Sequence, residues 1–468
     1  MIEPTLIDTP SIAAPEWLQS LHFIGIGGAG MSGIALVLHK RGYRVTGSDL
    51  KPSRYVTLLE RAGVAVTMGH KAVNIDHPDV VVISSAIPAH NVELQEARRR
   101  GVLVVKRAQA LAWLMLSGRG IAVCGTHGKT TTTSMISRVL VDGGFDPTFL
   151  VGGELNDLGS NASHGEGEFV VCEADESDGS LLLLSPEVAV LTNLELDHHS
   201  HYLHVEDVED VFRSFLGRLP ATGLLVYCGE DPRVSVLAGQ VGCRACSYGF
   251  AASSDYQARE VSAKLPGSSF EIWGRGFNLA SVTLEVPGKH NVLNALACFA
   301  TLVELGVAPE QITEALSTFG GAVRRFEWKG ERNGVTVVDD YAHHPTELRA
   351  TLRAAREGDW ARVIAVFQPH LYSRTEFLQT EFAEALLEAD IPVVTDVYGA
   401  REDPRPGVSG KLIVDSMLRL DQRKPVVYLP RLASVVDYLE TVTAPGDLVL
   451  TLGAGDVHRV GERFLVAG

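Results

Sequence analysis

The length, composition and charge of the chain set the first limits on its class. It has 468 residues, of which 46% are hydrophobic and 21% charged, and its formal net charge is −16. This length predicts about three domains, and the negative charge argues against nonspecific binding to nucleic acid or to an anionic membrane surface.

The sequence also argues against insertion into a membrane and against export. No apolar run approaches the roughly 20 residues that cross a bilayer, and residues 1–20 lack the basic and apolar segments of a signal peptide. The six cysteines are scattered, and the single C-x-x-C pair, Cys243 and Cys246, has no second pair nearby to complete a zinc site. We therefore expect a cytoplasmic protein that binds neither membrane nor nucleic acid.

The first unit of the chain carries a glycine fingerprint. A strand over 21–26 runs into G-I-G-G-A-G-M-S-G at 25–33 and a helix to about 41, and Asp49 ends the next strand. This spacing matches G-x-G-x-x-G with an acid about 20 residues later. The alternation continues with helices at 55–62 and 91–100 and strands at 64–67, 80–84 and 102–104. It predicts a doubly wound sheet for NAD or for a nucleotide sugar, and the motif alone does not choose between them.

The central stretch, residues 121–135, reads I-A-V-C-G-T-H-G-K-T-T-T-T-S-M. Strand, glycine turn, Lys-Thr and helix are suited to a polyphosphate, because backbone N–H groups, the helix start and Lys129 all attract its oxygens. Thr130 stands where a P-loop places a Mg²⁺ ligand. Val123 occupies the first glycine position of the strict pattern, so we predict a shorter loop turned by Gly125. A glycine turn that only joins strand to helix is the alternative.

Acidic and histidine side chains follow the next two predicted strands. The strand 168–173 ends at Glu173 within E-A-D-E-S-D-G-S, and the strand 188–191 leads into T-N-L-E-L-D-H-H. Parallel strands would gather Glu173 and His198 as metal ligands at one sheet edge, although solvated loop side chains are the simpler reading. Residues 256–286 are rich in β pattern. Asn291 and Asn294 then share one helical face, where they would read an adenine edge or cap the helix.

The last unit repeats the α/β alternation. Strands are predicted at 335–339, 363–367, 392–396, 426–429 and 448–452. Polar clusters follow three of them, at 339–347, 368–375 and 396–402. Because carboxyl ends of parallel strands share an edge, these clusters predict an active-site edge. The fold prediction is thus three α/β domains: a Rossmann-like domain over 1–107, a P-loop ATPase-like domain with a mainly parallel sheet and added strands over 108–321, and a Rossmann-like domain over 322–468.

Six motifs in this order make the chain similar to the Mur ligases of peptidoglycan synthesis. They are G-I-G-G-A-G-M-S-G-I-A, G-T-H-G-K-T-T-T-T, E-A-D-E-S-D-G-S, T-N-L-E-L-D-H, G-K-H-N-V-L-N-A and D-D-Y-A-H-H-P-T-E. The opening motif resembles the member that adds L-alanine more than the sisters that add later residues. The resemblance implies ATP-dependent ligation of L-alanine to the lactyl carboxylate of UDP-N-acetylmuramate, through an acyl phosphate. It does not decide whether the protein is a monomer or a dimer.

The resemblance also implies a role for each matching position. The catalytic residues would be Lys129, Glu173, His198 and Arg325, and two Mg²⁺ ions would be held by Thr130, Glu173 and His198. ATP would meet Gly125, Thr126, His127, Gly128, Lys129, Thr130, Thr131, Asn291, Arg325 and Asp340. The UDP-sugar would meet Gly27, Gly28, Ala29, Gly30, Met31, Ser32, Asp49, His70, Ser84, Ser85, Ile87, Thr192 and Asn193. L-Alanine would meet Tyr341, His343 and Arg374.

Two departures from the family pattern affect these expectations. Leu371 replaces the first arginine of H-R-Y-S/T-R, so Arg374 would carry more of the contact with the alanine carboxylate. Residues 200–218 contain no lysine, so the modified lysine that several sister ligases use as a metal ligand is absent. The amine base is open among His198, His199 and His343. The rival readings are an NAD-dependent protein, an ATP-driven switch, and a folylpolyglutamate synthetase-like ligase.

Overall fold

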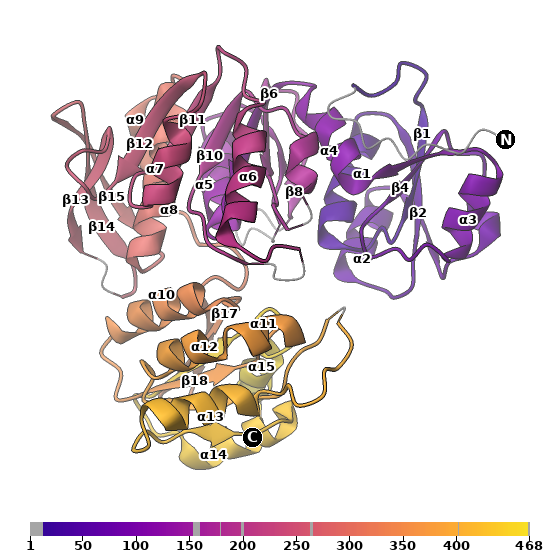
Figure 1. The fold of residues 1–468 in the computed structure, drawn as a ribbon. Coiled ribbons are helices and arrows are strands. Elements are labelled where there is room, and N and C mark those ends of the chain that lie inside the picture. The colour runs from indigo at the N-terminus through magenta and orange to yellow at the C-terminus, as the bar shows by residue number, and fades with distance from the viewer. Residues whose placement is uncertain are drawn as a thin grey trace. The chain divides into compact units, whose positions relative to one another are not determined.

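The computed structural model describes residues 13–152, 160–177, 179–197, 201–262, 265–400 and 402–466. They form two compact units: one contains residues 1–195, 204–257 and 295–315, the other residues 196–203, 258–294 and 316–468. Three sheets carry the fold (Figure 1), so the predicted α/β class is confirmed. Within the described ranges, no helix combines the length and the apolar character needed to span a membrane.

The first sheet has the strand order β3-β2-β1-β4-β5, and every pairing in it is parallel. Its strands are β1 (Ser20–Ile24), β2 (Arg44–Asp49), β3 (Ala65–Met68), β4 (Val80–Ile83) and β5 (Leu103–Lys106). The helices are α1 (Ala29–Lys40), α2 (Arg54–Arg61), η1 (Ala72–Asn74), α3 (Val92–Arg99) and α4 (Arg107–Met115). All four residues of β4 are buried, as expected for a parallel strand covered on both faces.

The second sheet has ten strands in the order β15-β14-β13-β12-β11-β10-β6-β9-β7-β8. Its strands are β6 (Arg119–Cys124), β7 (Thr148–Leu150), β8 (Ala162–Ser163), β9 (Phe169–Glu173), β10 (Val188–Leu191), β11 (Leu224–Cys228), β12 (Arg244–Gly249), β13 (Tyr256–Ser262), β14 (Ser268–Gly274) and β15 (Phe277–Leu284). The accompanying helices are α5 (Lys129–Asp142), η2 (Ser180–Leu183), α6 (Val205–Leu216), α7 (Pro232–Ala238), α8 (Lys289–Glu304) and α9 (Pro309–Ser317). The β-rich stretch predicted from the sequence is the antiparallel pair β14 and β15 with β13.

The third sheet has the order β16-β17-β21-β18-β19-β20, parallel except at the edge strand β16. Its strands are β16 (Glu327–Arg332), β17 (Val335–Asp340), β18 (Val363–Phe367), β19 (Ile391–Val394), β20 (Val427–Tyr428) and β21 (Leu448–Leu452). The helices are α10 (Pro345–Arg356), α11 (Tyr372–Phe377), α12 (Gln379–Leu386), α13 (Lys411–Leu420), α14 (Leu432–Val442) and α15 (His458–Val466).

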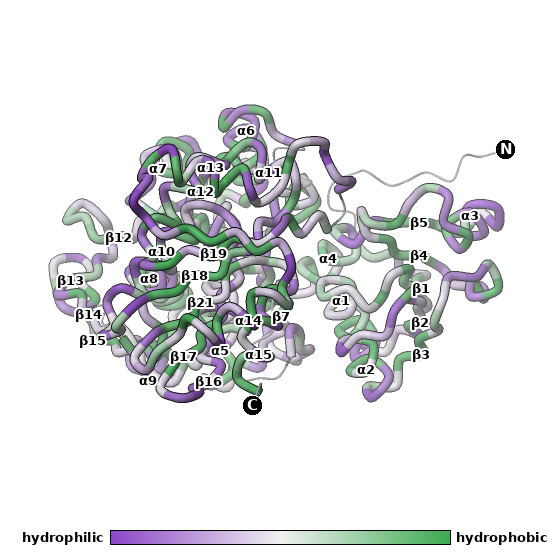
Figure 2. The backbone as a smooth tube through the Cα atoms, turned by 90° about the horizontal axis from the view of Figure 1, so that it is seen from below, coloured by the Kyte–Doolittle hydropathy of each residue, from purple (hydrophilic) through white to green (hydrophobic). Residues whose placement is uncertain are grey.

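Amphipathic helices cover both faces of this third sheet with their apolar sides. One core contains residues of α10, α12 and α13 packed on β17, β18 and β21, and the other contains residues of α14 and α15. Figure 2 shows β18 and β19 as hydrophobic segments, in keeping with strands that are buried on both sides. The two cores hold the strands rigid, and the loops after their carboxyl ends are left to carry chemistry.

Candidate active site

The loop between β6 and α5 is shaped by two glycines in conformations that other residues avoid. Gly125 has φ +124°, and a Cβ there would lie 2.2 Å from Thr192 Oγ1; Gly128 has φ +81°. Thr192 Oγ1 donates to the carbonyl of His127 (2.6 Å), and Asn193 Oδ1 accepts from the His127 N–H (2.8 Å). β10 pairs with β6, so the residues after β10 hold the loop in place. Thr192 and Asn193, expected beside a sugar substrate, make their described contacts with this loop.

Lys129, the first residue of α5, is held inside the loop. Its ammonium donates to the carbonyls of Gly125 (2.5 Å) and Thr126 (3.1 Å) and to Glu176 Oε2 (2.9 Å). Burial alone would lower the pKa of Lys129, but the carboxylates of Glu176 and Asp175 outweigh it and raise that pKa above its ordinary value. The loop therefore holds a fixed positive charge beside backbone groups that suit a polyphosphate. Thr130 and Thr131 follow in the first turn of α5, and Thr131 is buried.

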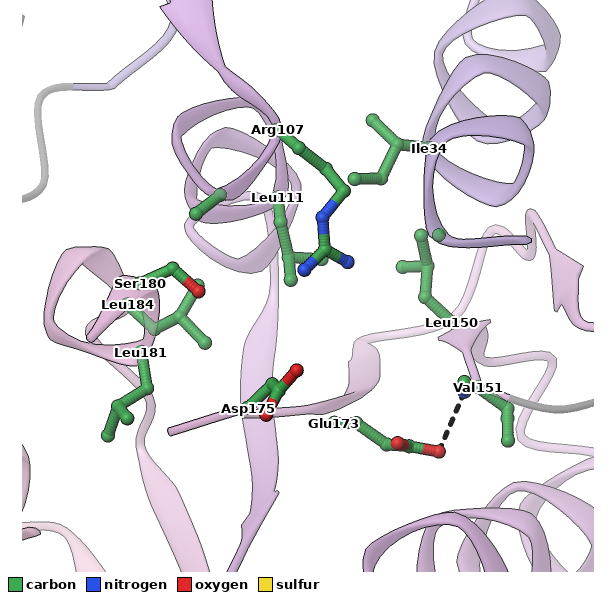
Figure 3. A pocket seen from close by; sticks show the side chains of 13 residues that line it. Ile34, Arg107, Leu111, Leu150, Val151, Glu173, Asp175, Ser180, Leu181 and Leu184 are labelled. Carbon is green, nitrogen blue, oxygen red and sulfur yellow. Dashed lines mark hydrogen bonds between the residues drawn. The ribbon is translucent and has the colours of Figure 1, made fainter. Parts of the chain in front are cut away.

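Glu173 ends β9, the strand on the other side of β6. Its Oε1 accepts from the Gly152 N–H at 2.7 Å. The carboxylate lines a pocket of about 230 Å³ together with Asp175 and, from the first sheet's elements, Gly30 and Arg107 (Figure 3). Glu173 is thus one strand away from the loop between β6 and α5, and it lines the same pocket as Gly30 of the first glycine turn. Carboxylate oxygens in such a place suit a hard cation such as Mg²⁺.

Replacement of Glu173 by glutamine tests this assignment, because the amide keeps an oxygen for the Gly152 N–H and removes the charge. We expect the Mg²⁺ concentration for half-maximal ADP release to rise by roughly tenfold or more, since Mg²⁺ is bound through one or two carboxylates. Asp175→Asn is the matched control, because Asp175 already accepts from the N–H and hydroxyl of Ser177. An unchanged Mg²⁺ titration in Glu173→Gln would contradict the metal-ligand role.

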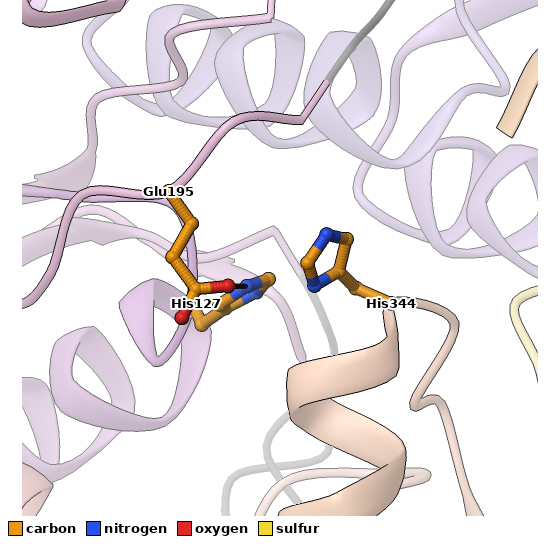
Figure 4. A group of neighbouring side chains, drawn as sticks. All are labelled: His127, Glu195 and His344. Carbon is orange, nitrogen blue, oxygen red and sulfur yellow. Dashed lines mark hydrogen bonds and ion pairs between the residues drawn. The ribbon is translucent and has the colours of Figure 1, made fainter. Parts of the chain in front are cut away.

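His127 and His344 each contact residues of their own compact unit. His127 Nε2 lies 3.3 Å from Glu195 Oε2 (Figure 4). His344, also drawn there, is the N-cap of α10, and its Nδ1 accepts from the Thr346 N–H. The predicted metal ligand His198 and the candidate base His199 lie outside the described residues.

The first glycine turn joins β1 to α1. The N–H of Gly27 donates to Asp49 Oδ2 at 2.8 Å, and a Cβ at Gly27 would lie 2.9 Å from the same oxygen. Gly28 is the N-cap of α1, and the predicted diphosphate residues Ala29, Gly30, Met31 and Ser32 form its first turn. Ile87, which follows β4, lies against Gly25: a Cβ added at Gly25 would be 3.2 Å from Ile87 Cδ1. Ser84 and Ser85 follow the end of β4 directly. The predicted UDP-sugar residues of the first sheet therefore follow its carboxyl ends, where α/β sheets bind ligands.

A buried carboxylate that the sequence analysis missed supports His70. The Nδ1 atom of His70 lies 2.9 Å from Ser48 Oγ, and that hydroxyl donates to Glu93 Oε2 at 2.5 Å. Burial would raise the pKa of Glu93, but the nearby His22 ring and hydrogen bonds from Ser48 and Asn74 hold it at about 2. Glu93 lies on α3 in a helical pattern that looks like a solvated face, so no sequence signal set it apart.

Asn291 is buried in the first turn of α8. Its Nδ2 donates to the carbonyl of Pro287 (2.8 Å), and its Oδ1 accepts from Asn294 Nδ2 (3.3 Å). One donor hydrogen of Asn291 and one acceptor lone pair thus hold the helix start. Because α8 begins at Lys289, Asn291 lies inside the helix and is not its N-cap, so the capping alternative is wrong. Adenine recognition by Asn291 stays a prediction.

The segment before the third sheet is strained and well bonded. Arg324 and Phe326 have φ of +61° and +47°. The Arg324 guanidinium donates to Asp339 Oδ2 (2.8 Å) and to the carbonyls of Gly453 and Gly455, and it stacks over Tyr341. Asp340 accepts from the N–H groups of Phe326 and Ala342, yet burial raises its pKa to about 6 against the effect of Arg325.

The loops after β17 and β18 bring the predicted amino-acid residues together. Tyr341, His343 and His370 form edge-to-face ring pairs with centroids 5.3 and 5.6 Å apart. Burial lowers the pKa of His343 to about 3, so its imidazole is neutral at physiological pH. A neutral ring with so low a pKa is a weak base for an ammonium group.

Arg374 is 3% exposed and makes a bidentate ion pair with Asp197, which is 5% exposed. Its Nε and Nη2 donate to Asp197 at 2.7–3.0 Å, and Nη1 donates to His370 Nδ1 at 3.1 Å. Leu371 is the N-cap of α11, has φ +69° and is buried. An arginine at Leu371 would therefore bury a second cation, and the leucine suits an apolar position.

Comparisons with known proteins agree with this geometry. Family models match residues 20–119 (Mur ligase family, catalytic domain), 123–302 (Mur ligase middle domain) and 324–455 (Mur ligase, glutamate ligase domain). The chain is 51% and 48% identical to the UDP-N-acetylmuramate–L-alanine ligases of Rubrobacter xylanophilus and a Geobacter species. Each match covers 96% of this chain and 99% or 97% of the relative.

Two solved structures are also similar along their whole length. The UDP-N-acetylmuramate–alanine ligase of Thermotoga maritima is 31% identical with a TM-score of 0.80, covering 95% of this chain and 98% of that one. A murein peptide ligase of Psychrobacter arcticus is 26% identical with a TM-score of 0.70, covering 96% and 98%.

Proposed function

The chain belongs to the Mur ligase family, and from that premise we propose that it joins L-alanine to UDP-N-acetylmuramate with consumption of ATP, in the synthesis of peptidoglycan precursors. The observation that carries this is a match over nearly the whole chain to ligases of that one activity. The glycine loop, whose Lys129 pairs with Glu176, and Glu173 at the end of the neighbouring strand β9 support this proposal.

A carboxylate and an amine do not condense in water without activation, so the proposed reaction has two steps. The lactyl carboxylate attacks the γ-phosphorus of ATP, the bond to the bridging oxygen breaks, and ADP leaves. The amine of L-alanine then attacks the acyl phosphate, inorganic phosphate leaves, and the amine loses a proton. Lys129 neutralises charge on the β- and γ-phosphates, as lysine does in other phosphoryl transfers.

Mg²⁺ would be held by Thr130, Glu173 and His198, and two ions are proposed. The hydroxyl and carboxylate oxygens suit Mg²⁺, and Glu173 opens onto a pocket. When bound, Mg²⁺ offsets the repulsion between the substrate carboxylate and the phosphates, about 1 kcal/mol at 4 Å in water and several in a drier site. Because His343 is a weak base and His198 is assigned to the metal, we assign the amine proton to His199 or to solvent.

The remaining assignments are kept as proposals. The nucleotide would bind at Gly125, Thr126, His127, Gly128, Lys129, Thr130, Thr131, Asn291, Arg325 and Asp340, and the UDP-sugar at residues 27–32, Asp49, His70, Ser84, Ser85, Ile87, Thr192 and Asn193. Tyr341, His343 and Arg374 would form the amino-acid site. The three domains would extend over 1–107, 108–321 and 322–468, in a cytoplasmic enzyme.

Phosphate release from purified protein tests the function. The assay supplies ATP and Mg²⁺ with UDP-N-acetylmuramate or UDP-N-acetylglucosamine, and with L-alanine, glycine, L-serine or D-glutamate. We expect release only when UDP-N-acetylmuramate is present, and fastest with L-alanine. Equal release with UDP-N-acetylglucosamine, which has no lactyl carboxylate, or preference for another amino acid would contradict the proposal.

A further inference from the structure

Arg107 stands in the pocket between the first glycine turn and Glu173, where no sequence motif drew attention to it. It is the first residue of α4, directly after β5. Its side chain extends into the pocket, on the opposite side from Glu173 and Asp175 (Figure 3). The pocket therefore presents a cation on one wall and two carboxylates on another.

The guanidinium is placed against the backbone of the glycine turn. A Cβ at Gly30 would lie 2.5 Å from Arg107 Nη1 and 3.4 Å from its Cζ. Gly30 belongs to the first turn of α1, whose N-terminal N–H groups attract anions. An anion bound at this turn would be within reach of both the backbone donors and the guanidinium fork.

Among the residues that the structure describes, none pairs with Arg107 to explain its position. Across the described part of the chain, its guanidinium makes no hydrogen bond or ion pair, although it is partly buried. A guanidinium has five N–H donors, and donors withdrawn from water usually find an acceptor. Other cations of the same compact unit are paired, as Lys129 is with Glu176 and Arg119 is with Glu187.

We propose that Arg107 binds the diphosphate of a nucleoside-diphosphate ligand that lies over Gly30, with its planar fork on the phosphate oxygens. This deepens the proposed function, on which it rests, by adding a substrate-binding residue outside the glycine turn. A phosphate suits the site better than a ligand carboxylate does. A phosphate presents two oxygens to the guanidinium fork and still has others for the α1 N–H groups. The sugar end would then extend towards Glu173 and Asp175, where the reacting carboxylate is needed.

Calorimetric titration with UDP, uridine and UDP-N-acetylmuramate tests this binding role. In Arg107→Ala, we expect the Kd for UDP and for UDP-N-acetylmuramate to rise by the same factor, about 10- to 100-fold, as for a charge-assisted hydrogen-bonded pair. Uridine, which has no phosphate, should bind both proteins alike. Lys106→Ala is the matched control, because Lys106 is an exposed neighbour with the same charge outside the pocket. Its Kd values should stay within twofold of wild type.

Three outcomes overturn the inference, and they have different meanings. Weaker binding of UDP-N-acetylmuramate with unchanged UDP binding would assign Arg107 to the lactyl carboxylate. Unchanged binding of both ligands would leave Arg107 without a binding role. If the wild-type protein binds neither UDP nor UDP-N-acetylmuramate, the proposed function fails, and the inference fails with it. Arg107→Lys keeps the charge and loses the planar fork, so its Kd for UDP should lie between those of the wild type and Arg107→Ala. This second variant guards against a result that comes from misfolding of Arg107→Ala.

Discussion

Replacing Lys129 by alanine is expected to lower ligase turnover by about 10³-fold or more, because a preorganised charge beside the transferring phosphoryl group is lost. The turnover is measured as the phosphate release that depends on both UDP-N-acetylmuramate and L-alanine. The lysine ammonium is already inside the loop, on the Gly125 and Thr126 carbonyls and Glu176. These contacts fix the positive charge at the loop where the β- and γ-phosphates are proposed to bind, so the charge is preorganised.

Stability complicates this variant and also supplies its control. Glu176 is 1% exposed, so Lys129→Ala leaves a buried carboxylate without its ammonium partner. The double variant Lys129→Ala/Glu176→Gln removes that charge and should recover most of the lost free energy of unfolding while activity stays absent. Activity within tenfold of wild type in the single variant would refute the loop assignment. Recovery of activity in the double variant would show that the loss came from misfolding.

Sequence periodicity was enough to predict the three sheets and the loops that carry the chemistry. Buried parallel strands such as Val80–Ile83 and Val188–Leu191 are short apolar runs bounded by turn residues, and glycine motifs mark where they end. Less regular elements were missed. The helix Arg107–Met115 is apolar on all sides, so it has no amphipathic period to detect. The edge strand Glu327–Arg332 is largely polar.

The partners of the site residues were harder to predict than the site residues themselves. Glu93 lies on a charged helix whose side chains usually face solvent, and Arg107 begins a helix that the sequence did not predict. Only the fold reveals that Glu93 is buried and that Arg107 lines a pocket. Likewise, the sequence placed Asp197 next to a metal-ligand candidate and Arg374 in an amino-acid site 177 residues away. Their pairing depends on how distant segments fold together, which local patterns do not encode.

Asp197→Asn is expected to destabilise its compact unit by roughly 3–5 kcal/mol, because it leaves the Arg374 guanidinium buried without a countercharge. If Arg374 serves the amino-acid site, the carboxylate of L-alanine competes with Asp197 for it in the wild type. In the variant that carboxylate would replace the missing anion. L-Alanine at 100 times its Kd should then raise the free energy of unfolding of the variant by about 2.7 kcal/mol, as measured by denaturant unfolding.

L-Alaninamide is the matched ligand, because it keeps the amine and methyl group and lacks the carboxylate. It should give Asp197→Asn little or no stabilisation, and L-alanine should lose its effect in Asp197→Asn/Arg374→Met, where no guanidinium remains to be paired. Equal stabilisation by alanine and alaninamide would mean that Arg374 does not bind the amino acid. Its bidentate contact with Asp197, with His370 on the third nitrogen, would then be a fixed structural pair that orients the segment next to His198.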